Sequence, residues 1–311
     1  MNAFNPFDAS QTPPPPVPAA ELEGLRSHQV LDLQIASLDR FLDLADAANN
    51  SDLTWPGRKA PRTTTPTVTA HVFNGDCLAV LPRLADGSVD LVLTDLPYGT
   101  TACAWDSIVP LDRMWAELKR VAKPGAAFVF TAQQPFTWAL AASNPQDLRY
   151  ELVWEKPNGT NPFNAKRQPM KKHENVLVFC ERQTVYHPQM EEGTPYRWNS
   201  KRSKGQAGGN DKLANQVIDN PGLRYPGSVL RFKQERGLHP TQKPVELMEW
   251  LIRTYSNPRD RVLDFTMGSG TTGIAALRSG RSFVGIELDG GYFDIASQRL
   301  ARFDPGEAAN S

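Results

Sequence analysis

The strongest constraint on the fold is a glycine-rich turn, Asp264–Gly273 (DFTMGSGTTG), between a predicted strand at 261–265 and a predicted helix at 272–277. Its glycines satisfy the spacing G-x-G-x-x-G, and Glu287 ends the next predicted strand, about twenty residues on. Glycines let a ligand approach the backbone closely, and an acid at that strand end can accept hydrogen bonds from two ribose hydroxyls. The turn predicts a nucleoside-containing cofactor. NAD, S-adenosylmethionine (SAM) and a plain turn without ligand all remain open on this feature alone.

Strands and helices alternate along most of the chain. This rhythm predicts an α/β fold with a mainly parallel sheet. The expected strands are Val72–Phe73, Ser88–Leu93, Ala126–Thr131, Arg261–Phe265 and Ser282–Leu288, and the expected helices are Cys77–Leu84, 110–122, Pro244–Tyr255, Thr272–Leu277 and Gly291–Phe303.

Composition divides the chain further. Residues 1–67 are expected to be an extension, partly disordered and proline-rich, with one helix at about 20–48. The catalytic domain is expected at 68–303, followed by a tail at 304–311. Within this domain, residues 183–236 are rich in Gly, Asn, Gln, Pro, Lys and Arg, and they read as an insertion.

The chain has no net charge, yet its positive charge is concentrated in one region. Residues 149–236 carry sixteen Lys and Arg against nine Asp and Glu, a local charge of +7. Such a region can contact phosphates, or can be a solvated loop without a ligand. Cys77, Cys103 and Cys180 have neither disulfide-framework nor zinc-site spacing, so no metal is expected. No apolar run is long enough for a membrane span, so no membrane partner is expected.

A second unusual stretch, Asp95-Leu96-Pro97-Tyr98, follows the strand predicted at Ser88–Leu93. An exocyclic amine on a nucleobase is a poor nucleophile, and its two N–H bonds need fixed acceptors. The Asp95 carboxylate can accept one and the Leu96 carbonyl the other. Pro97 would stiffen the turn, and Tyr98 offers a flat face for a base taken out of the duplex. A surface β-turn is the alternative interpretation.

These motifs resemble those of the amino-methylating DNA methyltransferases. Asp95–Tyr98 is similar to the family's catalytic tetrad (D/N/S)-P-P-(Y/F/W), and the glycine turn is similar to its SAM motif D-P-F-x-G-S-G-T-T. The tetrad precedes the SAM motif, a permuted order that resembles the β class. Leu96 replaces the first proline of the tetrad, and Phe265-Thr266 replaces the P-F pair. Asn74–Cys77, Trp154–Asn158, His173–Asn175 and His239–Pro244 are similar to further family segments.

The resemblance implies a Rossmann-like SAM-dependent methyltransferase fold and a role for each matching residue. Asp76 would hold the adenine amine of SAM, Glu287 its ribose, and Thr241 and Lys243 its carboxylate. The cofactor-binding residues are expected to be Asp76, Cys77, Thr241, Lys243, Asp264, Phe265, Gly268, Ser269, Gly270, Thr271, Thr272 and Glu287. His239 is expected to be a turn histidine without a chemical role.

The polar insertion would be the target-recognition region, with basic side chains on phosphates and polar ones on base edges. The residues expected on DNA are Lys156, Lys166, Arg167, Lys171, Lys172, Lys201, Arg202 and Lys204.

The sequence therefore predicts a DNA methyltransferase that acts on adenine N6, because an initial Asp in the tetrad goes mostly with adenine in the family. Cytosine N4 is the alternative acceptor. A non-catalytic SAM- and DNA-binding subunit and an NAD-dependent oxidoreductase explain fewer of the motifs, and a protein methyltransferase normally carries its tetrad after the SAM turn. The resemblance further implies that the partner is duplex DNA and that the protein forms a homodimer. It also implies a cytoplasmic protein encoded by a bacterium or a phage. Whether a restriction endonuclease accompanies it stays open.

Overall fold

A computed structural model of the chain describes residues 68–99, 108–160, 162–199, 217–235, 237 and 242–303. The chain divides into two compact units at residues 61 and 62, and the described residues all belong to the second unit. The predicted N-terminal extension with its helix at 20–48, and the predicted tail at 304–311, lie outside the described residues. No helix in the described part has the length and apolar character to cross a bilayer.

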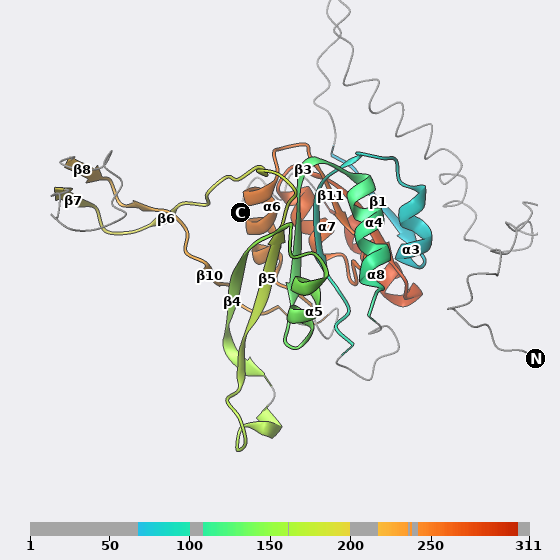
Figure 1. Cartoon of the computed structure of the whole chain (residues 1–311), viewed down its shortest axis with the longest axis horizontal. Helices are drawn as coiled ribbons and strands as arrows, with labels where there is room; N and C mark the ends of the chain where they lie inside the picture. Colours follow the sequence, from blue (N-terminus) through green and yellow to red (C-terminus); the bar gives the residue numbers. More distant parts are fainter. Residues whose placement is uncertain are drawn as a thin grey trace, which may run out of the picture. The chain divides into compact units, whose positions relative to one another are not determined.

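One eight-stranded sheet organises the second unit, in the order β1-β12-β11-β2-β3-β5-β4-β10 (Figure 1). β5 is antiparallel to both of its neighbours, and the other neighbouring pairs are parallel. This confirms the prediction of an α/β fold with a mainly parallel sheet. The strands are β1 Ala70–Asn74, β2 Val89–Asp95, β3 Ala122–Ala132, β4 Leu148–Thr160, β5 Lys171–Phe179, β10 Val229–Arg231, β11 Arg261–Asp264 and β12 Ser282–Glu287.

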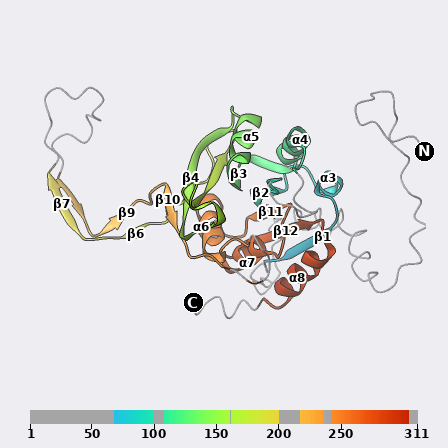
Figure 2. The same ribbon diagram turned by 90° about the horizontal axis from the view of Figure 1, so that it is seen from below.

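Helices cover both faces of the sheet (Figure 2). One group packs on the face that includes Leu91 and Leu93, and another group packs on the face that includes Val92. Alternate residues of β2 thus serve two separate cores, which explains why this strand reads as a continuous apolar run. The first group is α6 Val245–Tyr255, α7 Thr271–Arg278 and α8 Gly290–Ala301, and the second is α3 Cys77–Val80, α4 Leu111–Val121 and α5 Phe136–Ser143.

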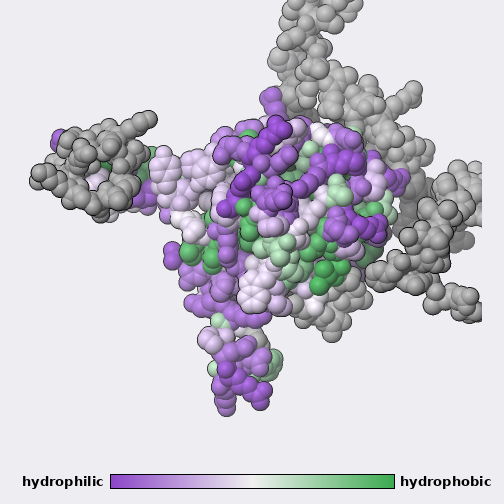
Figure 3. Space-filling model, in the orientation of Figure 1, coloured by the Kyte–Doolittle hydropathy of each residue, from purple (hydrophilic) through white to green (hydrophobic). Residues whose placement is uncertain are grey.

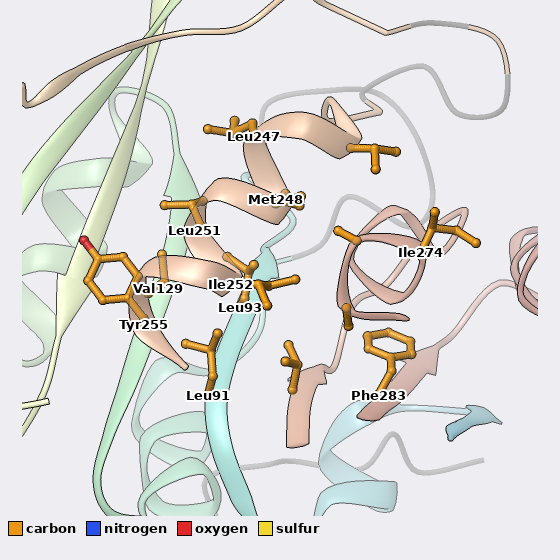
Figure 4. Packing of buried hydrophobic residues seen from close by; sticks show 14 of the residues in the cluster. Leu91, Leu93, Val129, Leu247, Met248, Leu251, Ile252, Tyr255, Ile274 and Phe283 are labelled. Carbon is orange, nitrogen blue, oxygen red and sulfur yellow. The ribbon is translucent and has the colours of Figure 1, made fainter. Parts of the chain in front are cut away.

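The core between α6 and the sheet is well filled (Figure 4). Leu251 and Ile252 of α6 lie near Leu91 and Leu93 of β2, Leu247 belongs to the same cluster, and all five side chains are fully buried. Parallel strands that are covered on both faces need this burial on each side to be stable. The packing fixes α6, and with it Lys243, two residues before the helix, against the end of β2.

The polar segment at 183–236 has little regular structure among its described residues. β6 Glu191–Glu192 pairs with β9 Leu223–Arg224, and β7 Tyr196–Asn199 pairs with β8 Val217–Asn220. The last strand of the segment, β10, differs from the expectation of a separate insertion because it joins the main sheet beside β4.

The carboxyl ends of the parallel strands meet at one edge of the sheet. Asn74 lies beside Glu287 in the register, Asp95 beside Thr131, and Asp264 beside Gly285. In open α/β sheets ligands bind beyond this edge. The two motifs that the sequence singles out, the tetrad and the glycine turn, therefore lie on the same side of the molecule.

Candidate active site

A cavity of about 780 Å³ lies at the carboxyl edge of the sheet. Its volume is within the range of ordinary small-molecule sites. The wall is formed by residues that follow β1, β2, β11 and β12 and by residues before α6. Both predicted motifs reach it, since Asp95–Tyr98 and Gly268 are in the wall.

The tetrad begins inside the sheet. Asp95 is the last residue of β2, two residues beyond the predicted strand end, and its side chain is 22% exposed. The Leu96 side chain is buried in the core between β2 and α4, so a leucine is accommodated where the family has proline. Pro97 and Tyr98 are half-buried at the cavity.

Three side chains fix the Asp95 carboxylate. The Tyr98 hydroxyl donates to Oδ1 at 2.5 Å, the Thr131 hydroxyl donates to the same oxygen, and the Lys243 ammonium donates to Oδ2. The Thr266 hydroxyl also donates to the Asp95 backbone carbonyl at 3.0 Å. Charge-assisted hydrogen bonds of this kind hold a carboxylate in one orientation. Asp95 is thus a preoriented hydrogen-bond acceptor at the cavity wall.

Lys243 belongs to a chain of alternating charges in the cavity wall. Its ammonium bridges Asp95 and Glu174, with 3.3 Å to Glu174 Oε2, and Lys156 reaches Glu174 Oε1 at 2.5 Å. Both lysine side chains are only 5% exposed. Buried charges are tolerated only when they are paired, and here each charge has an opposite neighbour.

The protonation states within this chain follow from the pairing. Burial would raise the pKa of Glu174, but the ammonium groups of Lys243 and Lys156 outweigh it and lower the pKa. Burial would lower the pKa of Lys243, but Asp95 and Glu174 outweigh it and raise the pKa. Both groups are therefore charged at neutral pH.

Tyr98 is held on one ring face and at its hydroxyl. Its ring stacks on Phe136 of α5 with 5.6 Å between ring centroids, and the Lys243 ammonium lies 5.7 Å from its centroid. Burial, together with the nearby carboxylates of Asp95 and Glu174, raises the pKa of Tyr98 well above its usual value. The hydroxyl is therefore a neutral donor to Asp95.

The glycine turn opposite the tetrad uses its glycines for different purposes. Gly268 has φ of 51° and its N–H donates to Glu287 Oε2 at 2.8 Å. Gly270, at the N-terminus of α7, has φ of 77° and lies against Ala296, where an added Cβ would come within 3.1 Å. An added Cβ on Gly273 would lie 2.7 Å from Phe283. Gly270 and Gly273 thus serve the backbone turn and helix packing.

Glu287 and Asp76 place carboxylates on the cavity wall near this turn. Glu287 is buried at the end of β12, and its oxygens accept the N–H groups of Gly268 and Asp289, the latter at 2.9 Å. Burial raises its pKa. Asp76 caps α3 by accepting the Leu78 N–H at 2.9 Å. A carboxylate has about four acceptor sites, so both groups can also accept ligand hydroxyl or amino protons.

Asp264→Asn is expected to remove a pH dependence of stability. Burial raises the pKa of Asp264 from 3.8 to about 7, against the opposing hydrogen bonds from Thr272, Thr94 and the Thr266 N–H. Because the folded state holds the Asp264 proton more tightly than the unfolded state, protonation of Asp264 stabilises the fold. This stabilisation is fully present below pH 3.8 and is lost as the pH rises through about 7. The wild type should therefore lose stability on the order of a few kcal/mol relative to Asp264→Asn between pH 5 and pH 8. Urea unfolding at both pH values measures this; parallel pH dependences would contradict it.

Most predicted cofactor residues reach the cavity. Gly270 lies outside the wall and supports the turn, and Lys243 lies in the wall but pairs there with Asp95 and Glu174. The cofactor roles of both residues stay predictions. Thr241, like His239, lies outside the described residues. The residues in the wall are Asp76, Cys77, Lys243, Asp264, Phe265, Gly268, Ser269, Thr271, Thr272 and Glu287.

The residues expected on DNA fall into three groups. Lys156 is buried in the cavity wall, where it pairs with Glu174, so it is not one of the exposed cations and its contact with DNA stays a prediction. The exposed basic residues at the end of the β4–β5 hairpin are Lys166, Arg167, Lys171 and Lys172. The remaining three, Lys201, Arg202 and Lys204, lie outside the described residues.

Sequence reasoning missed several residues that build the site. Glu174 lies in a segment singled out as family-like, yet no role was assigned to it. Thr131 and Thr266 come at the carboxyl ends of predicted strands, where a ligand site is expected, and this position was the available signal. Phe136 gave no such signal, because its contact with Tyr98 depends on the placement of α5.

The sequence model of the DNA methylase family matches residues 89–298 of the chain. The match includes the tetrad, the charge chain behind it and the glycine turn, and it covers more than half of the chain.

Individual proteins agree with this match. The chain is 29% identical over 250 residues to the Type II methyltransferase M1.MboII of Moraxella bovis, which covers 73% of this chain and 94% of that protein. The solved M1.HpyAVI–SAM complex is 25% identical, with a TM-score of 0.52, and covers 75% of this chain and all of that one. The cytosine-N4-specific PvuII DNA methyltransferase shares the fold, with a TM-score of 0.56 at 16% identity over 78% of this chain and 91% of that one.

Proposed function

The chain belongs to the DNA methylase family, and we propose that it transfers a methyl group from SAM to the N6 amino group of an adenine in duplex DNA. Membership makes it an amino-DNA methyltransferase whose acceptor is adenine N6 or cytosine N4. The choice of adenine is supported by the aspartate that begins the tetrad. The observation that carries the proposal is the Asp95 carboxylate, which Lys243, Tyr98 and Thr131 fix at the wall of the cavity.

SAM is the cofactor, and the cavity fits it. The related M1.HpyAVI was solved in complex with SAM. Here, Glu287 is placed to accept hydrogen bonds from ribose hydroxyls, and Asp76 from an adenine amino group. The carboxylates of Asp76 and Glu287 in the wall also favour a ligand with a positive centre. SAM supplies an electrophilic methyl group on its sulfonium sulfur.

The acceptor half of the site orients the amino group of the base. Asp95 Oδ2 accepts one hydrogen bond from Lys243 and can accept a second from an amino N–H. The Leu96 carbonyl accepts the other N–H, which directs the nitrogen lone pair toward the donor side. The same Asp95 carboxylate can take the proton that the nitrogen loses after transfer. Tyr98 offers its ring face opposite Phe136 for stacking on the flipped base. Fixed acceptors lower the barrier because they need no reorganisation during the reaction.

The identity of the methylated base can be read from DNA made in cells. A plasmid is propagated in bacteria that lack other DNA methyltransferases and that express the chain, and it is then sequenced for modified bases. N6-methyladenine at one recurring site is the expected result. N4-methylcytosine would support the alternative acceptor, because the same carboxylate and carbonyl can hold the cytosine amino group.

The β4–β5 hairpin is the proposed DNA contact beside the cavity. Its register continues to Thr160 and Lys171, past the Ala132–Asn175 pair that ends β3 (Figure 1). Thr160 is in the cavity wall. Mainly hydrophilic side chains cover the end of the hairpin, where Lys166 and Arg167 are exposed (Figure 3). We propose that these cations neutralise phosphates next to the target base.

Lys166→Ala/Arg167→Ala is expected to weaken binding to DNA of any sequence. Loss of two phosphate contacts should also reduce the slope of log affinity against log salt concentration by about 2. Fluorescence anisotropy over a salt series measures both quantities. Lys119→Ala/Lys123→Ala removes two cations near the opposite end of β3 and should leave the slope unchanged. Equal slopes for wild type and the hairpin variant would contradict the assignment.

The segment at 183–236 stays our proposal for the target-recognition region, and the extension at 1–67 stays a separate predicted region. A homodimer and an accompanying restriction endonuclease also stay predictions. Because the proposed substrate is DNA, we propose that the protein acts in the cytoplasm of a bacterium, encoded by the host or by a phage.

A further inference from the structure

The most exposed large apolar side chain in the described part of the chain is Phe163. It is 98% exposed and lies in the short 3-10 helix Pro162–Asn164 at the end of the β4–β5 hairpin. A side chain this exposed contributes almost none of the stabilisation that burial of an aromatic ring gives to a folded protein. A phenylalanine held in this position calls for a partner that covers it.

The surroundings of Phe163 point to a polyanion as that partner. Lys166, Arg167, Lys171 and Lys172 are all exposed within nine residues of it in the sequence, on the same hairpin end. Met170, 41% exposed, is a second apolar side chain among these cations. An exposed aromatic ring on the same hairpin end as four exposed cations suits a nucleic acid, which offers phosphates and flat bases together.

The distance to the reaction site is short. Thr160 is part of the cavity wall, and Phe163 follows it by three residues. A chain of three residues spans at most about 11 Å, so the Phe163 backbone lies within that distance of the wall. The ring is therefore close to where a duplex must lie to deliver a base to Asp95.

We propose that Phe163 inserts into the base stack of the duplex at the position that the target base leaves. This inference rests on the proposed function. Flipping a base out of a duplex breaks its pairing and its stacking on both neighbours. Apolar side chains that enter a base step are known wedges in protein–DNA complexes, and a phenyl ring can restore part of the lost stacking. The exposed cations of the hairpin would contact the phosphates of the nucleotides next to the target base.

The test separates insertion from simple binding. The methylated site is first located in plasmid DNA, and two duplexes are made: one fully paired, and one with an abasic position opposite the target base. Single-turnover methyl transfer from labelled SAM is then measured for wild type and Phe163→Ala. We expect the variant to lose about 10- to 100-fold on the paired duplex. The loss should shrink to a few-fold on the abasic duplex, where the target base is already unpaired and costs less to flip.

Two further variants define the effect. Phe163→Trp keeps a flat ring and should retain most of the activity on the paired duplex. Trp138→Ala removes a 68% exposed aromatic side chain from α5 and should behave like the wild type on both duplexes.

The outcomes are distinguishable. An equal loss on both duplexes, or no loss on either, would overturn the insertion while leaving the proposed function intact. Absence of labelled methyl groups in DNA with the wild type would overturn the proposed function itself.

Discussion

Asp95→Ala is expected to slow methyl transfer by about 10³-fold or more while SAM affinity stays within a few-fold of the wild type. The substitution removes the carboxylate that accepts the amino N–H of the base, and it leaves Glu287, Asp76 and Gly268 in place on the donor side of the cavity. Single-turnover transfer from labelled SAM measures the rate, and calorimetric titration measures the affinity.

Asp95→Asn is the matched control for this substitution. Its amide oxygen keeps one acceptor, so its rate should lie between those of Asp95→Ala and the wild type. A loss of SAM affinity that parallels the loss of rate would instead make Asp95 a cofactor ligand. A rate close to that of the wild type would contradict its role in the reaction.

Lys243→Met is expected to destabilise the folded state by about 3–5 kcal/mol, because it leaves the buried Glu174 carboxylate and the partly buried Asp95 carboxylate without their shared ammonium. The lowered pKa of Glu174 sets the pH dependence. The ionised Glu174 carboxylate stabilises the folded state above pH 4.5, the usual pKa of a glutamate. This stabilisation is lost as the pH falls through the lower pKa that Glu174 has in the folded state. The deficit of the variant should therefore be greatest near neutral pH and should narrow in acid. Urea unfolding at pH 7 and pH 4 measures it.

Two controls accompany this prediction. Lys243→Met/Glu174→Gln removes one charge of each sign, so it should recover part of the loss. Lys119→Met breaks the half-exposed ion pair with Asp147 and should cost about 1 kcal/mol or less. A Lys243→Met variant as stable as Lys119→Met would contradict a structural role for the buried charge chain.

The parts of the fold that could be predicted are those whose signal is local. The segment 261–288 contains a β-rich apolar run, a glycine turn, a helix and a second apolar run in order, and the structure has β11, α7 and β12 there. The tetrad is recognisable for the same reason, because it directly follows a strongly apolar strand. The predicted boundaries differ from the structure by one or two residues at most of these elements.

The β4–β5 hairpin was harder to predict. β4 contains Pro157 and Gly159, and β5 begins with the polar residues Lys171-Lys172-His173, so neither strand shows a clean apolar pattern over its full length. Both strands are stabilised by their pairing with each other and, for β5, with β3. That pairing depends on the sheet order, which no local pattern specifies.

The charge chain could not be predicted from spacing. Asp95 and Lys243 are 148 residues apart, and Glu174 comes from a third region of the chain. They meet because β2, β5 and the start of α6 converge at one edge of the sheet. The same reason applies to Lys156 and Lys243. In the sequence they look like solvated or ligand-binding cations, and only the fold brings carboxylates to them.

The most direct test of the central claim uses the purified chain, methyl-labelled SAM and mixed-sequence duplex DNA. After incubation the DNA is digested to nucleosides, which are separated and counted. We predict label in N6-methyldeoxyadenosine with the wild type and at least about 10³-fold slower labelling with Asp95→Ala. Label in N4-methyldeoxycytidine would contradict the choice of adenine, and DNA without label, from a protein that still binds SAM, would contradict methyl transfer by this site.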